Sequence, residues 1–154
     1  MCKKNVGFTI GKFAPLHKGH QFLIETAIAE MDEFYVVIYD TDIIDVNIEK
    51  RAKWIKNLYP SVHIIYAYNS PKQYGLDEES VKIQMDYLSK LIKGIPVTHF
   101  YSSELYGQKV AEYLKIENRI VDLERKEIPI SARKIREDYK GNLDYLEEVV
   151  FSDL

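Results

Sequence analysis

The chain has 154 residues, of which 46% are hydrophobic and 29% are charged, and its formal net charge is -3 at pH 7. This length predicts one domain, residues 1–154, with a core of its own. The small negative charge gives no general attraction to nucleic acid or an acidic membrane, so we expect neither as a partner. The chain has a single cysteine, no signal peptide and no apolar run of roughly 18 residues, so we expect a cytoplasmic protein.

Apolar runs rich in β-forming residues alternate with amphipathic stretches along the chain. Strands are predicted, in order, over residues 6–10, 34–39, 62–68, 97–101 and 119–123. Helices are predicted over residues 17–31, 48–59, 77–93 and 105–114, with a last helix after residue 131. This alternation predicts a Rossmann-like, doubly wound α/β fold of about five parallel strands with helices on both faces. Ligands of such sheets bind at the carboxyl ends of the strands, where the strand order reverses.

The junction between the first strand and the first helix, VGFTIGKFAPLHKGH, carries the clearest functional signal. His17 and His20 lie three residues apart at the start of the helix, which places them on one face. Unpaired main-chain N–H groups and the positive end of the helix dipole surround them. The junction therefore predicts a phosphate-binding site.

Two common phosphate motifs do not fit this junction. A P-loop needs four residues between its glycine and the Gly-Lys pair, but only three separate Gly7 from Gly11-Lys12, and Phe13 replaces the hydroxyl residue that binds magnesium. The dinucleotide fingerprint GxGxxG is also absent. The pattern that does match is GxFxPxHxGH.

With these residues in view, the chain resembles the nucleotidyltransferase superfamily that carries an HxGH motif after its first strand and an ISxTxIR-like motif near its end. Here these motifs read HKGH at residues 17–20 and ISARKIR at residues 130–136. Together with GKFAPLHKGHQFLIETA and YSSELYG, they are most similar to the nicotinamide-mononucleotide (NMN) adenylyltransferase domain of the NadR proteins. The resemblance is weakest between residues 69 and 96.

The resemblance implies an enzyme that transfers AMP from ATP to a phosphorylated acceptor and releases pyrophosphate. The acceptor implied first is NMN, which would give NAD. Catalysis of this kind depends on positioning and on stabilisation of negative charge. No cluster of protein metal ligands is evident, so Mg2+ is expected to arrive bound to ATP.

The resemblance also assigns roles to the two motifs. His17 and His20 would donate to phosphate oxygens, and Lys12 would act beside them as a mobile charge, so these three are the predicted catalytic residues. Ser131 caps the last helix and could bind a phosphate, as could Arg136, whereas Arg133 stands where the family often has threonine. The predicted ATP-binding set is Gly11, Phe13, Gly19, Ser102, Ser103, Glu104, Ser131, Arg133 and Arg136.

The acceptor side is less well defined by the sequence. The predicted acceptor-binding residues are Asp40, Arg51, Trp54 and Tyr74, although a tryptophan at this helical spacing is also typical of a core. NadR relatives carry a tryptophan after the third strand that can stack on nicotinamide, where this chain offers only Tyr68 and Tyr74. The alternative is therefore an adenylyltransferase or a cytidylyltransferase that uses a phosphopantetheine-type or polyol-phosphate acceptor.

A second alternative is a module that binds ATP or NAD for regulation without turnover. The complete set of His17, Gly19, His20 and Ser131 favours the enzyme, because a sensor does not need a full transfer site. The sequence leaves open whether the protein is a monomer or a homo-oligomer, and which base or nicotinamide form it prefers.

Overall fold

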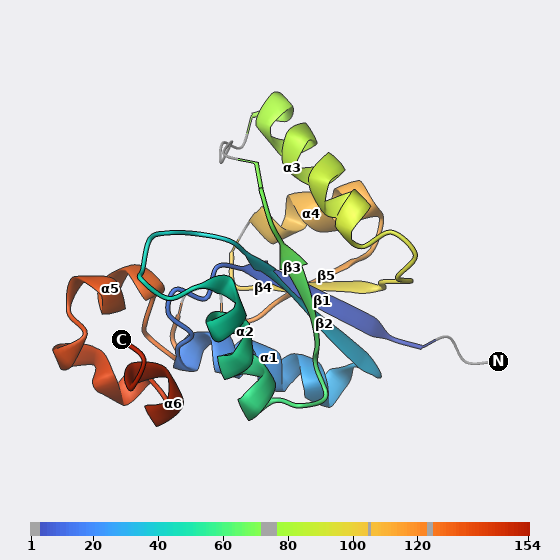
Figure 1. Cartoon of the computed structure of the whole chain (residues 1–154). Coiled ribbons are helices and arrows are strands. Elements are labelled where there is room, and N and C mark those ends of the chain that lie inside the picture. The colour runs from blue at the N-terminus through green and yellow to red at the C-terminus, as the bar shows by residue number, and fades with distance from the viewer. Residues whose placement is uncertain (1–3, 72–76, 105, 123–124) are drawn as a thin grey trace.

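The computed structural model describes residues 4–71, 77–104, 106–122 and 125–154, and its centre is a sheet of five parallel strands (Figure 1). The strands are β1 (Val6–Gly11), β2 (Glu33–Tyr39), β3 (His63–Ala67), β4 (His99–Ser102) and β5 (Glu117–Ile120). Their order in the sheet is β3-β2-β1-β4-β5, and every neighbouring pair is parallel. This order reverses beside β1, as the predicted doubly wound fold requires, and it places the switch point between β1 and β4.

Helices cover both faces of the sheet (Figure 1). The helices are α1 (Lys18–Glu30), α2 (Ile48–Leu58), α3 (Glu78–Leu91), α4 (Tyr106–Leu114), α5 (Ala132–Glu137) and α6 (Glu148–Phe151), with a 3-10 helix, η1, over Lys140–Tyr145. Figure 1 shows α1 and α2 on one face, α3 and α4 on the other, and α5 and α6 beyond one end of the sheet. Within the described residues, the helices are too short or too polar to cross a membrane.

The strand β2 shows why its sequence reads as a nearly continuous apolar run. Val36 and Ile38 belong to the core under α1 and α2, whereas Val37 belongs to the core under α3 and α4. Successive side chains of a strand point to opposite faces, so a strand covered on both faces is apolar at every position. The helix α3 packs on one of these faces, where Met85 and Leu88 are buried in the same cluster as Val37.

The carboxyl-terminal third departs most from the sequence prediction. The strand β5 runs from Glu117 to Ile120 rather than over residues 119–123, because its pairing with β4 begins opposite His99 and ends opposite Ser102. Residues after 138 form η1 and α6, which the sequence pattern does not predict. These elements are too short to show a periodic pattern.

A buried arginine on α2 joins the loops at the carboxyl ends of β1 and β2. The Arg51 side chain is 0% exposed. Its Nη1 donates to the carbonyl oxygens of Lys12 and, at 3.0 Å, Tyr39, and its Nε donates to that of Val46 at 3.1 Å. One rigid guanidinium group therefore sets the positions of three chain segments around the switch point.

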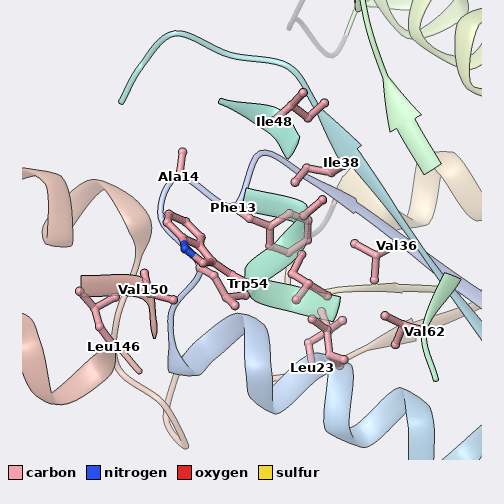
Figure 2. Close-up of a cluster of buried hydrophobic side chains, with 14 of the residues drawn as sticks. Phe13, Ala14, Leu23, Val36, Ile38, Ile48, Trp54, Val62, Leu146 and Val150 are labelled. Carbon is pink, nitrogen blue, oxygen red and sulfur yellow. The ribbon is translucent and has the colours of Figure 1, made fainter. Parts of the chain in front are cut away.

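Trp54, one turn further along α2, attaches the end of the chain to this region. Figure 2 shows its indole between the loop residues Phe13 and Ala14 and the carboxyl-terminal residues Leu146 and Val150. Its Nε1 donates to Oδ2 of Asp153 at 2.7 Å. The segment after α5 is thereby packed against the loop that leads into α1.

We expect Arg51→Met to lower the free energy of unfolding by about 3 kcal/mol, because it leaves buried carbonyl oxygens without a donor. Urea denaturation followed by circular dichroism measures this change. The matched control is Lys53→Met on the exposed face of the same helix, which should change stability by less than about 0.5 kcal/mol. Equal stability of the two variants would contradict the bridging role of Arg51.

Candidate active site

The two motif histidines cap α1 reciprocally. His17 is the N-cap residue, and its Nδ1 accepts from the main-chain N–H groups of Gly19 at 3.0 Å and His20 at 3.3 Å. In return, Nδ1 of His20 accepts from the main-chain N–H of His17 at 3.2 Å. The rings stack with centroids 3.7 Å apart and planes inclined by 22°. HKGH is therefore a capping box made of two imidazoles.

This arrangement fixes the chemistry that each ring offers. Since both Nδ1 atoms accept hydrogen bonds, the proton of each neutral ring lies on Nε2, which is available as a donor. Burial and, secondarily, the positive charge of Arg125 lower the pKa of His17 from 6.5 to about 3. Burial lowers the pKa of His20 as well, with further contributions from His17 and Arg125. The pair therefore offers two uncharged N–H donors at neutral pH.

Glycines beside the motif leave room for its rings. A Cβ atom at Gly19 would lie 2.8 Å from Cε1 and 3.0 Å from Nδ1 of His17, so any side chain there would displace the capping imidazole. A Cβ atom at Gly11 would lie 3.1 Å from the ring of Phe13. Phe13 is itself buried and contacts the ring of His20 edge-on, with centroids 4.7 Å apart. Three of the predicted ATP-binding residues therefore shape or support the histidine pair.

The motif near the end of the chain lies against the first one. Nη1 of Arg136 donates to the carbonyl oxygen of Ala14 at 2.9 Å, a contact between residues 122 positions apart. Ser131 caps α5 by accepting from the main-chain N–H of Lys134 at 3.3 Å. Arg133 lies apart from this contact on the exposed face of α5, where its side chain is 83% exposed and pairs with Glu137. The structure thus brings Arg136 to the HKGH loop, whereas the role of Arg133 toward a nucleotide stays a prediction.

The segment after β4 borders the same end of the sheet. β4 is paired with β1 in parallel, so Ser102 at its end, with Ser103 and Glu104 directly after it, lies on the side of the sheet where β1 ends. Ser102 donates through Oγ to the carbonyl oxygen of Glu104 at 3.0 Å and lies against Gly107. Lys12 follows β1 directly, and its carbonyl oxygen is held by Arg51. The roles of these four residues toward a nucleotide stay predictions.

The predicted acceptor residues that the structure describes lie directly after β2, at Asp40, and on α2, at Arg51 and Trp54. Asp40 accepts from the main-chain N–H of Asn69 at 3.0 Å and from Oγ of Ser70 at 3.1 Å. Arg51 and Trp54 are buried, and the contacts described above tie them to main-chain oxygens and to Asp153. Tyr74 lies outside the described residues. Tyr68 is 49% exposed beside this group and donates to Glu49 at 2.7 Å.

Arg125 is a cation near the histidines that is not among the predicted site residues. Arg125, in the turn after β5, is close enough for its charge to act on both His17 and His20. Its Nη1 donates to the carbonyl oxygen of Ile130 at 2.8 Å. The sequence signal that could have identified Arg125 is a basic residue six positions before Ser131, shortly after a predicted strand.

Among the described residues, no group of three or more His, Cys, Asp or Glu side chains is placed to hold a metal ion.

The doubly wound sheet, the paired histidines after β1 and the ISARKIR helix define a nucleotidyltransferase-like domain of the HxGH superfamily. The chain belongs to the family described as the citrate lyase ligase C-terminal domain, which matches residues 8–126. It is also homologous to the trifunctional NAD biosynthesis/regulator protein NadR of Salmonella typhimurium, with 31% identity over 155 residues. That match covers 88% of this chain but only 37% of the relative.

Solved structures share the fold. A NadR protein in complex with NAD and AMP-PNP matches 96% of this chain and 46% of its own, with a TM-score of 0.70 and 24% identity. A bifunctional NMN adenylyltransferase/ADP ribose pyrophosphatase from Francisella tularensis, complexed with AMP and a manganese ion, matches 89% of this chain and 42% of its own, with a TM-score of 0.63 and 17% identity. The chain thus spans less than half of each of these proteins.

The lowered histidine pKa values predict a loss of stability in weak acid. Between pH 6.5 and about 3 the unfolded chain holds a proton on His17 that the folded chain does not. The stability contributed by the neutral ring is therefore complete above pH 6.5 and is lost as the pH falls, at up to about 1.4 kcal/mol per pH unit for each such histidine.

Urea denaturation at pH 7 and pH 5 measures this slope. His17→Asn should reduce it while keeping an N-cap side chain, because asparagine is a good cap. The control is His63→Asn, on the exposed side of β3, which should keep the slope of the unmodified protein. The assignment would be wrong if His17→Asn and His63→Asn lost stability equally between the two pH values.

Proposed function

We propose that this chain transfers the AMP group of ATP to a phosphorylated acceptor, with NMN as the first candidate, and releases pyrophosphate. The observation that carries the proposal is the pair of uncharged Nε2–H donors of His17 and His20, fixed by reciprocal capping at the switch point of the sheet. The NAD-related name of the NadR relative, and the NAD, AMP-PNP and AMP in the complexes of structural neighbours, support this class of reaction.

The proposed reaction needs no covalent enzyme intermediate. An oxygen of the acceptor phosphate attacks the α-phosphorus of ATP, a new P–O bond forms, and the bond to the bridging oxygen of the β-phosphate breaks. Pyrophosphate leaves with the electron pair of that bond. The attacking phosphate is already an anion, so no general base is required, and positioning and charge stabilisation supply the catalysis.

The residues of this chain would divide that work by their placement. His17 and His20 donate to non-bridging oxygens as charge accumulates on them, and neutral donors held in place need no reorganisation. Lys12, directly after β1, and Arg136, hydrogen-bonded to Ala14 before the HKGH motif, would add positive charge. Magnesium enters as part of the substrate MgATP, held by phosphate oxygens and water. Ser131 and the first N–H groups of α5 complete the phosphate contacts.

The acceptor side of the proposal rests on the ends of β2 and β3. The Arg51 guanidinium holds the main chain at Lys12 and Tyr39, so it would position the loops that contact the acceptor rather than contact the acceptor itself. Trp54 would act similarly, by holding the carboxyl-terminal segment. Tyr68, an exposed aromatic ring beside Asp40, is the described residue best suited to stack on a flat acceptor base.

The direct test measures pyrophosphate released from MgATP in the presence of separate acceptors. NMN, nicotinic acid mononucleotide, 4′-phosphopantetheine and glycerol 3-phosphate form the panel, and CTP replaces ATP in a parallel series. We expect equal amounts of NAD and pyrophosphate with NMN, identified by mass spectrometry. Binding of ATP or NAD without pyrophosphate from any acceptor would overturn the proposal and favour a regulatory module.

Replacing His20 tests its role in transfer. His20→Asn should lower kcat by about 100-fold, because the donor to the developing charge is misplaced. The asparagine oxygen can still accept from the main-chain N–H of His17, so the melting temperature should change little. His63→Asn, an exposed histidine far from the motif, should keep full turnover. An unchanged kcat in His20→Asn would remove His20 from the catalytic residues.

A further inference from the structure

One carboxylate after β5 organises the described residues 125–128 that lead to the ISARKIR motif. Asp122 accepts from the main-chain N–H groups of Lys126 at 2.8 Å, Glu127 at 3.0 Å and Ile128 at 2.9 Å. Both Asp122 and Arg125 adopt left-handed backbone conformations, with φ of 53° and 54°. These bonds hold Arg125 at a defined place in the turn.

The side chain of Arg125 reaches the meeting point of the two motifs. Its Nη1 donates at 2.8 Å to the carbonyl oxygen of Ile130, the residue directly before the cap Ser131. Cγ2 of Ile130 lies 3.7 Å from the place a Cβ of Gly19 would occupy, next to the imidazole of His17. The guanidinium group is thus tethered beside HKGH, and its charge depresses the pKa values of both histidines.

A triphosphate site made from uncharged histidines needs permanent positive charge from other side chains, and a triphosphate carries more negative charge than the two proposed cations Lys12 and Arg136 would balance. Arg133, the cation that the sequence offers at the threonine position of the motif, lies on the exposed face of α5 and pairs with Glu137. Arg125 carries five guanidinium N–H donors, of which one meets the Ile130 carbonyl within the described part of the chain. A planar cation with donors to spare is suited to phosphate oxygens.

We propose that Arg125 is a further phosphate-binding residue of this site, where it supplies permanent charge beside the donors His17 and His20. This inference rests on the proposed function, since it assigns Arg125 to the polyphosphate of the same nucleotide. The proposal assigns this phosphate contact to Arg125, after β5, instead of to Arg133 on α5.

The test compares binding of inorganic pyrophosphate, ATP and adenosine by isothermal titration calorimetry. Arg125→Gln should weaken pyrophosphate and ATP by about tenfold or more, because a charge-assisted hydrogen bond is lost, and leave adenosine unchanged. Arg125→Lys should lie between that variant and the unmodified protein. Lys126→Gln removes the same charge from the same turn and serves as the matched control, with unchanged affinities.

The possible results separate this inference from the proposed function. Unchanged pyrophosphate affinity in Arg125→Gln overturns it, as does equal weakening of pyrophosphate and adenosine together with a lower melting temperature, which indicates a structural role. If ATP binds but no acceptor yields pyrophosphate, the proposed transfer fails while the pyrophosphate comparison still decides the role of Arg125. If the unmodified protein binds neither ATP nor pyrophosphate, both are wrong. Should Arg125→Gln not fold, Arg125→Lys and its pyrophosphate affinity decide.

Discussion

A buried guanidinium group holds together the carboxyl ends of β1 and β2, and the loops of the candidate site depend on it. Arg51 donates to the main-chain oxygens of Lys12, Tyr39 and Val46 from a position with no exposed surface. Burial lowers its pKa, and attraction to Asp40 opposes that effect. Because the arginine fork is rigid, the entrance to the HKGH loop and the end of the neighbouring strand keep a fixed separation.

Around this anchor the candidate site combines permanent cations with uncharged hydrogen-bond donors. Burial keeps His17 and His20 uncharged, and the reciprocal cap directs their protons to Nε2. Arginine side chains approach from two later segments, Arg136 from α5 and Arg125 from the turn before it. Such a combination suits nucleotidyl transfer, in which charge moves between phosphate oxygens and no proton has to be taken from the attacking group.

Membership of the citrate lyase ligase C-terminal domain family and homology to NadR agree with the HxGH motif and the sheet order. The chain covers 37% of the NadR relative, so that similarity concerns one part of a larger protein. Among the described residues of the segment after β3, Tyr68 is the exposed aromatic residue.

The sequence by itself determined the strand-helix alternation, the apolar run of β2 and the HKGH motif at the start of the first helix, because these features depend on residues close together in the chain. It placed β5 too late, since pairing with β4 rather than local pattern sets the ends of that strand. Only the tertiary structure decided that Arg51 and Trp54 turn inward, that Arg136 reaches Ala14 across 122 residues, and that Arg125 rather than Arg133 lies beside the histidines. Periodicity shows that a side chain faces the interior, but the partner it meets there is fixed by how distant segments pack.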